Sequence, residues 1–206
     1  MTKKIHEYDI ALYKNGTPVL DDDNRKQMRK ALNDKGPGFC LAKWTQVTMH
    51  LGVGLTHSCH HPVAHRIPLE ELKDNPSALH NTGFKKEQRK AMLNGQRPKE
   101  CDYCWRIEDA GNISDRVLKS MDSYSFSQYD AIANSTGEEE VYPKYVEVSF
   151  SNVCNFKCSY CGPTFSSKWA EEIKSKGPYK LANGTAFNRT EDMPLRVKGK
   201  LDYLIG

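Results

Sequence analysis

Seven cysteines are the residues of this sequence with the clearest potential for chemistry. They occupy positions 40, 59, 101, 104, 154, 158 and 161. An odd number of thiols cannot all pair within one chain, and the spacing divides them into a set of four followed by a set of three. This division predicts two metal sites rather than a disulfide framework.

The three later cysteines, Cys154, Cys158 and Cys161, are separated by three residues and then by two. Alternating apolar residues predict a strand over 145–150 directly before them, and a helix is expected over 166–174 after them. Thiolates this close together in one loop can bind a single soft metal centre. A 4Fe–4S cluster held by three cysteines has one iron without a protein ligand, which a small molecule can chelate.

This pattern, placed after a strand, resembles the signature of the radical SAM superfamily. The resemblance implies that Cys154, Cys158 and Cys161 bind a catalytic 4Fe–4S cluster whose open iron takes the amino and carboxylate groups of S-adenosylmethionine. An electron from the reduced cluster would cleave this cofactor to methionine and a 5′-deoxyadenosyl radical. The radical would abstract hydrogen from a substrate, expected to be a peptide or protein. Tyr160 matches the aromatic residue that packs near the adenine, and the electron donor is expected to be a protein such as flavodoxin or ferredoxin.

The residues alone leave other interpretations of the three-cysteine segment open. A zinc ion could bind three thiolates and a distant histidine, or the thiols could be incidental. Zinc sites more often use Cys-x-x-Cys pairs, so the triple spacing argues against zinc.

Cys40, Cys59, Cys101 and Cys104 provide four thiolates, which saturate one metal centre and leave no position for a substrate. Their spacing resembles the first part of the SPASM motif and its shortened relative, the twitch domain, which hold auxiliary 4Fe–4S clusters beside radical SAM barrels. The later SPASM cysteines are absent, since the sixth residue after Cys104 is Ala110, so the resemblance is to the one-cluster twitch form. It implies a second 4Fe–4S cluster for electron transfer or structure, although such domains usually follow the barrel and this motif precedes it.

Alternatives also remain open for the four-cysteine set. A zinc ribbon needs the same ligands and the same turn at Cys101 and Cys104, so zinc is the alternative metal. Five histidines crowd around Cys59, and one of them could replace a cysteine, although such residues more often support a ligand by hydrogen bonds. They are His50, His57, His60, His61 and His65. The alternative function is therefore a non-catalytic binding module stabilised by zinc or a cluster.

Local patterns predict the elements that position these cysteines. Alternation over 47–51 and glycines at 52 and 54 predict a β-hairpin that returns to Cys59. Helices are expected over 24–33, 69–73, 84–93 and 114–121. Residues 122–140 contain few large aliphatic side chains and are expected to form a linker. The predicted fold is an α+β metal-binding domain with a β-hairpin over 1–140, linker included, followed over 141–206 by the first β–α unit of an α/β, partial TIM-like barrel.

Composition excludes several classes of function. The net charge of +4 is mild and spread along the chain, so binding of nucleic acid is not expected. A mean hydropathy of −0.71 and the lack of a long apolar run predict no transmembrane helix, and the first residues lack the apolar region of a secretory signal. We therefore expect a cytoplasmic protein with reduced thiols and no membrane contact.

A complete radical SAM barrel needs more chain than follows the three-cysteine segment. Only 206 − 161 = 45 residues follow Cys161, whereas six strand–helix units of about 25–30 residues each need far more. The Gly-Gly-Glu-Pro-like segment expected on the second barrel strand is also missing from 162–206. We expect a fragment of a longer enzyme, or else a barrel completed by another polypeptide. The isolated chain is then expected to cleave S-adenosylmethionine poorly or not at all, which an anaerobic assay of 5′-deoxyadenosine tests.

Overall fold

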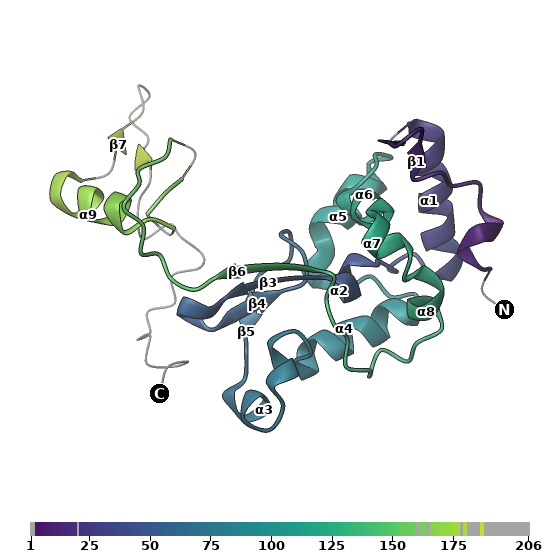
Figure 1. The fold of residues 1–206 in the computed structure, drawn as a ribbon, viewed down its shortest axis with the longest axis horizontal. Helices are drawn as coiled ribbons and strands as arrows, with labels where there is room; N and C mark the ends of the chain where they lie inside the picture. Colours follow the sequence, from purple (N-terminus) through teal and green to yellow (C-terminus); the bar gives the residue numbers. More distant parts are fainter. Residues whose placement is uncertain are drawn as a thin grey trace. The chain divides into compact units, whose positions relative to one another are not determined.

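The computed structural model describes residues 3–19, 21–159, 161–163, 165–177, 179–180 and 186–187, whose course is drawn in Figure 1. The chain separates into two compact units. The first unit comprises Met1–Thr48 and Thr56–Glu147, and the second unit comprises Met49–Leu55 and Val148–Gly206. Within the described ranges, no helix has both the length and the apolar character needed to cross a lipid bilayer.

Helix α1 (Asp22–Lys35) extends two residues beyond each end of the helix predicted over 24–33. The Asp21 carboxylate accepts a hydrogen bond from the Asn24 N–H at 2.8 Å, which satisfies one of the free N–H groups of the first turn. Gly36 follows the last helical residue. The buried apolar residues of the helix are Met28, Ala31 and Leu32. The helix packs against α6 (Asp115–Met121).

Aromatic side chains form the centre of the first unit's core. The ring centroid of Phe39 lies 5.8 Å from that of Trp44 and 5.7 Å from that of Tyr129. The Tyr129 hydroxyl donates a hydrogen bond to the carbonyl oxygen of Ala31 at 2.8 Å. Tyr129 therefore anchors its own segment to α1 by both apolar packing and a satisfied polar group.

The segment 122–140 was expected to be a linker, and this prediction was wrong for much of its length. It contains two short helices, α7 (Ser123–Phe126) and α8 (Tyr129–Ala133), and it buries Tyr129 and Ile132 in the core. Short helices with polar outer faces carry too few apolar positions for a clear helical period.

Further helices complete the described part of the first unit. They are η1 (Ile5–Glu7), α2 (Ala42–Thr45), α3 (Leu69–Asp74), η3 (Pro76–Leu79), α4 (Gly83–Leu93), η4 (Lys99–Cys101) and α5 (Asp102–Asp109). Thr82 caps α4 by accepting from the Lys85 N–H at 3.2 Å, and Ser114 caps α6 by accepting from the Arg116 N–H at 3.2 Å. The four helices expected in this unit are confirmed, with bounds that shift by one or two residues.

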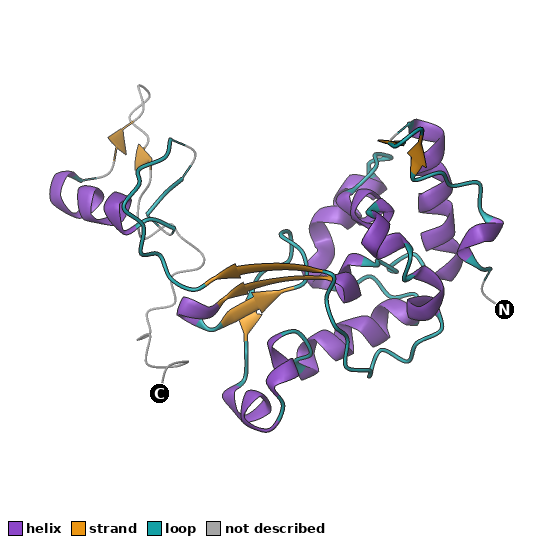
Figure 2. Ribbon diagram, in the orientation of Figure 1, coloured by secondary structure: helices purple, strands orange, loops and turns teal. Residues whose placement is uncertain are grey.

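A four-stranded sheet has the strand order β5–β4–β3–β6 and appears in orange in Figure 2. Strands β3 (Gln46–His50) and β4 (Leu55–His57) are neighbours joined by the turn η2 (Leu51–Val53), so the predicted hairpin is confirmed. Strands β5 (His65–Arg66) and β6 (Tyr145–Ser149) form the two edges. Among the described residues the strands form small open sheets and do not close into a barrel.

In the second unit, α9 (Ser167–Lys176) follows the loop that contains the later cysteines. The Ser166 hydroxyl caps this helix by accepting from the Trp169 N–H at 3.3 Å. The strand before this loop and the helix after it were both expected, and both are confirmed.

Each unit also contains a short antiparallel strand pair. In the first unit β1 (Tyr13–Lys14) pairs with β2 (Thr17–Pro18), and in the second β7 (Tyr179–Lys180) pairs with β8 (Ala186–Phe187).

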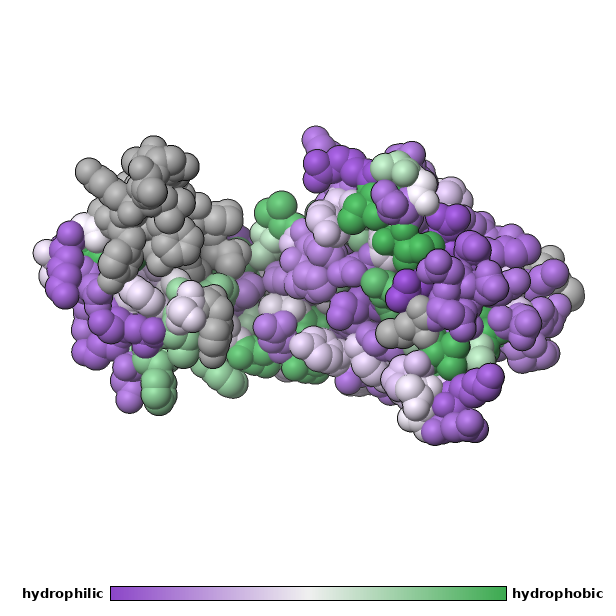
Figure 3. All heavy atoms as spheres, turned by 90° about the horizontal axis from the view of Figure 1, so that it is seen from above, coloured by the Kyte–Doolittle hydropathy of each residue, from purple (hydrophilic) through white to green (hydrophobic). Residues whose placement is uncertain are grey.

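The loop between β6 and α9 exposes several large apolar side chains. Phe150, Val153 and Phe156 are 73%, 83% and 67% exposed. On the molecular face drawn in Figure 3, hydrophobic patches interrupt a mostly hydrophilic surface.

Candidate metal centre

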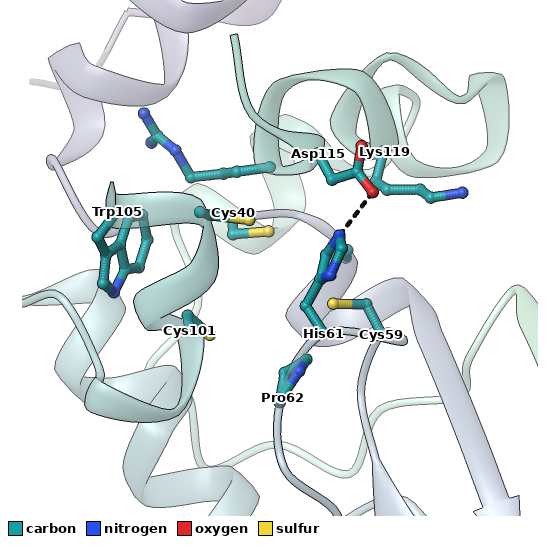
Figure 4. A pocket seen from close by; sticks show the side chains of 11 residues that line it. Cys40, Cys59, His61, Pro62, Cys101, Trp105, Asp115 and Lys119 are labelled. Carbon is teal, nitrogen blue, oxygen red and sulfur yellow. Dashed lines mark hydrogen bonds and ion pairs between the residues drawn. The ribbon is translucent and has the colours of Figure 1, made fainter. Parts of the chain in front are cut away.

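Four cysteines from separate parts of the first unit line one pocket of about 340 Å³, open solvent included. Cys40 precedes α2, Cys59 follows β4, Cys101 ends η4 and Cys104 lies in the first turn of α5. Figure 4 shows the side chains of Cys40, Cys59 and Cys101 arranged around this pocket. All four thiols are free of disulfide bonds. The structure thus brings the four cysteines of the earlier set together.

Hydrogen bonds from α6 hold the segment that carries Cys40. The Arg116 Nη1 donates to the Phe39 carbonyl oxygen at 2.9 Å, and the Leu41 N–H donates to the Ser120 Oγ at 3.2 Å. The residues on both sides of Cys40 are therefore fixed to one helix. This helix also contributes Asp115, Arg116 and Lys119 to the pocket wall.

A short helical turn presents Cys101 and Cys104 together. Residues three apart lie on the same face of a helix, so a Cys-x-x-Cys pair at a helix start points both thiols in one direction. Trp105 closes the wall beside them, and its indole N–H donates to the Pro98 carbonyl oxygen at 2.8 Å.

Four thiolates from one pocket can bind either a zinc ion or a 4Fe–4S cluster. The ligand set is chemically compatible with both metal centres.

Burial raises the pKa of all four thiols, and that of Cys101 rises to about 12. The neighbouring thiols raise the pKa of Cys40 further, because ionising them together would place like charges in one pocket. Coordination to a metal cation removes this penalty, since a coordinated thiol is deprotonated. The raised pKa values make the four thiols poor free nucleophiles, and a bound cation would stabilise their ionised form.

Backbone amides and a basic side chain partly offset the increase in thiol pKa that burial causes. The backbone amides of His61 and Arg116 lower the pKa of the Cys59 and Cys104 thiols, respectively. The buried Lys43 ammonium also lowers the pKa of Cys59 and Cys101. Amide dipoles and positive charge close to sulfur both favour the ionised thiolate.

Arg116 joins the pocket to the rest of the first unit. Its side chain is 1% exposed and forms an ion pair with Glu108 at 2.6 Å between Nη2 and Oε2. The same Nη2 donates to Asn33 Oδ1 at 2.8 Å, and the guanidinium carbon lies 5.7 Å from the Trp105 ring centroid. One buried cation therefore connects α1, α5 and α6 beside the cysteines.

Of the five histidines expected near Cys59, the pocket wall includes His61. The Nδ1 atom of His57 interacts with the Cys59 carbonyl oxygen, and the Nε2 atom of His65 lies 3.1 Å from the Thr82 Oγ1. Sequence reasoning missed other wall residues, namely Trp105, Asp115, Arg116 and Lys119. The sequence predicted a helix over 114–121 but gave no signal that this helix, α6, lies beside the cysteines.

The three later cysteines lie in the loop before α9, which the first turn of that helix holds in place. The Ser167 Oγ accepts from the Cys154 N–H at 3.2 Å and donates to the Cys154 carbonyl oxygen at 3.0 Å. The Trp169 indole N–H donates to the Cys158 carbonyl oxygen at 3.1 Å. The Cys161 N–H donates to that same oxygen at 3.0 Å. Tyr160, expected to contact the adenine of S-adenosylmethionine, lies outside the described residues.

No protein-family model, curated protein or solved structure matches this chain. The candidate metal centre therefore depends on its ligand set and on the geometry described above.

Proposed function

We propose that this chain is an iron–sulfur protein of the radical SAM type. A catalytic 4Fe–4S cluster is assigned to Cys154, Cys158 and Cys161, and a second cluster to the four-cysteine pocket. The observation that carries the proposal is the division of the thiols, since four line one pocket of the first unit and three lie in one loop of the second. Four ligands saturate a cluster, whereas three leave one iron open to a small molecule.

When bound, the three-cysteine cluster supplies reductive cleavage of S-adenosylmethionine to a radical that abstracts hydrogen from a substrate, proposed to be a peptide or protein. The chain's own residues hold the ligand loop in place for this chemistry. Ser167 binds both backbone groups of Cys154, and Trp169 binds the Cys158 carbonyl. The loop is thereby attached at two points to the first turn of α9.

The four-cysteine pocket is proposed to serve electron transfer or structure. A cluster with four thiolates is anionic. Arg116 and Lys119 line this pocket, and the Lys43 ammonium lies close enough to lower the pKa of Cys101, so all three bring positive charge to the cluster. The backbone amides of His61 and Arg116, which lower the pKa of Cys59 and Cys104, act in the same direction. Both effects favour the reduced form of a cluster. A cytoplasmic location and a donor such as flavodoxin or ferredoxin complete the proposal.

The proposal is tested on the full chain, purified and reconstituted with iron and sulfide without oxygen. The wild type is expected to hold about eight irons with matching sulfide, as two 4Fe–4S clusters require. A Cys154→Ala/Cys158→Ala/Cys161→Ala variant and a Cys101→Ala/Cys104→Ala variant are each expected to hold about four. Electron paramagnetic resonance of the reduced protein should respond to S-adenosylmethionine in the wild type and in the Cys101/Cys104 variant, and not in the triple variant.

Two outcomes would contradict the proposal. The first is zinc without sulfide in the wild type, which supports the non-catalytic binding module instead. The second is full iron content in the triple variant, because Cys154, Cys158 and Cys161 would then hold no cluster.

A further inference from the structure

Two adjacent histidines of the first unit face a single carboxylate oxygen. The Nε2 atom of His61 lies 2.7 Å from the Asp115 Oδ2, and the Nε2 atom of His60 lies 3.1 Å from the same oxygen. Figure 4 shows the His61 ring directed at Asp115. All three ligand atoms lie within 4.8 Å of one another. Two imidazole nitrogens and a carboxylate oxygen thus converge from two chain segments that are distant in the sequence.

The distances are close to those that a bound transition metal imposes. Zinc binds histidine nitrogen and carboxylate oxygen at about 2.0–2.2 Å, so two ligands of a tetrahedral site lie about 3.3–3.6 Å apart. The observed separations of 2.7 and 3.1 Å would need to widen by only a fraction of an ångström. Imidazole with carboxylate suits zinc, iron and related ions, whereas magnesium and calcium prefer oxygen ligands alone.

The surroundings hold the three side chains in this arrangement. The His61 ring stacks on the Tyr103 ring at 3.8 Å between centroids and an interplanar angle of 16°. Asp115 is the first residue of α6, directly after the Ser114 cap. His61 and Asp115 are 15% and 29% exposed in their side chains, whereas His60 is 53% exposed and leaves the site open to solvent. Three protein ligands and an open side are the features of a metal site that retains a position for water or a small ligand.

We propose that His60, His61 and Asp115 bind a divalent transition-metal ion of the zinc class, separately from the cysteine-bound metal. The ion joins the segment after β4 to the start of α6 and so links two parts of the four-cysteine pocket wall. His61 lies two residues after Cys59, so the ion also restrains the segment that carries one of the four cysteines. The site does not depend on which metal the cysteines hold.

The test uses zinc as the probe and the full chain with its cysteines loaded by iron and sulfide without oxygen. Zinc binding is measured by isothermal titration, and bound zinc and iron are counted after gel filtration. His60→Gln removes an exposed ligand that contributes little to folding, and Asp115→Asn removes the central one. His6→Gln is the matched control, because it removes an exposed imidazole elsewhere in the same unit.

The wild type and His6→Gln are expected to bind one further zinc ion per chain with equal affinity. Loss of a hydrogen bond that supports a metal ligand weakens metal binding by about 10- to 100-fold. The zinc affinity of His60→Gln and of Asp115→Asn, which each lack a ligand itself, should therefore fall by at least that factor. Their iron content should not change. Equal zinc binding by the wild type, His60→Gln and Asp115→Asn would overturn the proposal, as would the absence of saturable zinc binding. If the cysteines hold zinc instead of a cluster, total zinc rises in every chain, but the difference between the wild type and His60→Gln still decides the question.

Discussion

Arg116 is the single residue on which the shape of the four-cysteine pocket depends most. It is a buried cation whose partners are Glu108, Asn33 and the Phe39 carbonyl. Replacing it by methionine leaves the Glu108 carboxylate, itself 5% exposed, without a counter-charge. Breaking a buried ion pair in this way costs about 3–5 kcal/mol. Urea unfolding of Arg116→Met is expected to show a loss of that size.

The matched control for this change is Arg106→Met. Arg106 pairs with Asp102 on the exposed side of α5, where the side chains are 72% and 60% exposed. Exposed pairs of this type contribute about 0–1 kcal/mol. Equal losses in the two variants would show that Arg116 has no special role beside the cysteines.

Lys85 is a second residue whose burial has a measurable consequence. It is 1% exposed, and its ammonium nitrogen lies 2.9 Å from the Thr56 Oγ1. Burial lowers its pKa to about 6, from 10.5. Between these values the unfolded chain binds a proton that the folded chain does not, so stability rises with pH. Stability rises with pH from the folded pKa near 6 up to the unfolded value of 10.5, and above 10.5 Lys85 no longer adds to the slope.

The measurement is urea unfolding of the metal-loaded chain at pH 7, 7.5 and 8. This window lies above the usual titration of unfolded His80 and His65, whose folded pKa values burial lowers to about 2 and about 3. The stability of the wild type relative to Lys85→Met is expected to rise by on the order of 1 kcal/mol per pH unit. Parallel pH profiles of the two proteins would show that Lys85 is charged in the folded state.

At the scale of elements, α9 determines how the later cysteines are presented. Ser167 is the one residue of its first turn that binds both backbone groups of Cys154. Ser167→Ala removes the acceptor of the Cys154 N–H, and a hydrogen bond of this kind contributes about 1 kcal/mol. Hydrogen exchange at the Cys154 amide, followed by NMR, should accelerate about 5-fold.

A control for this change lies at the other end of the same helix. The Ser175 hydroxyl donates to the Glu172 carbonyl on the exposed surface, so Ser175→Ala removes a serine without touching the loop. Unchanged exchange at Cys154 in the Ser167 variant would contradict the assigned role of α9.

The elements also show what local sequence can and cannot predict. Helices α1 and α6 begin at Asp21 and Ser114 caps, and the chemistry of a cap is complete within three or four residues. Segment 122–140 was assigned wrongly because Tyr129 finds its partners in α1 and beside Phe39, about a hundred residues earlier. The spacing of the cysteines singled them out as candidate ligands, and the four earlier ones do line one pocket. The wall formed by α6 could not, because its place beside Cys40 depends on long-range bonds of Arg116 and Ser120.

At the scale of the whole molecule, bound metal is expected to contribute much of the stability of the first unit. Hydrophobic residues make up 38% of the sequence, a modest share for a chain that must bury a core. The pocket joins the segment before α2, the end of β4 and the start of α5. Because free thiols in the unfolded chain hold no preformed site, the binding free energy of the metal becomes folding free energy.

Removal of the metal proposed for the four-cysteine pocket should therefore lower the melting temperature of the first unit strongly. Structural metal sites contribute several kcal/mol, and for a chain of this size about 1 kcal/mol shifts the transition by about 2–4 °C, so a fall of more than about 10 °C is expected after anaerobic chelation. The triple variant at Cys154, Cys158 and Cys161 serves as the control, because it removes ligands of the second unit alone and should leave the transition of the first unit in place. An equal melting temperature with and without metal would mean that the helical core folds independently of its cysteines. In that case α6 and the Arg116 ion pair, rather than the metal, would hold the pocket together.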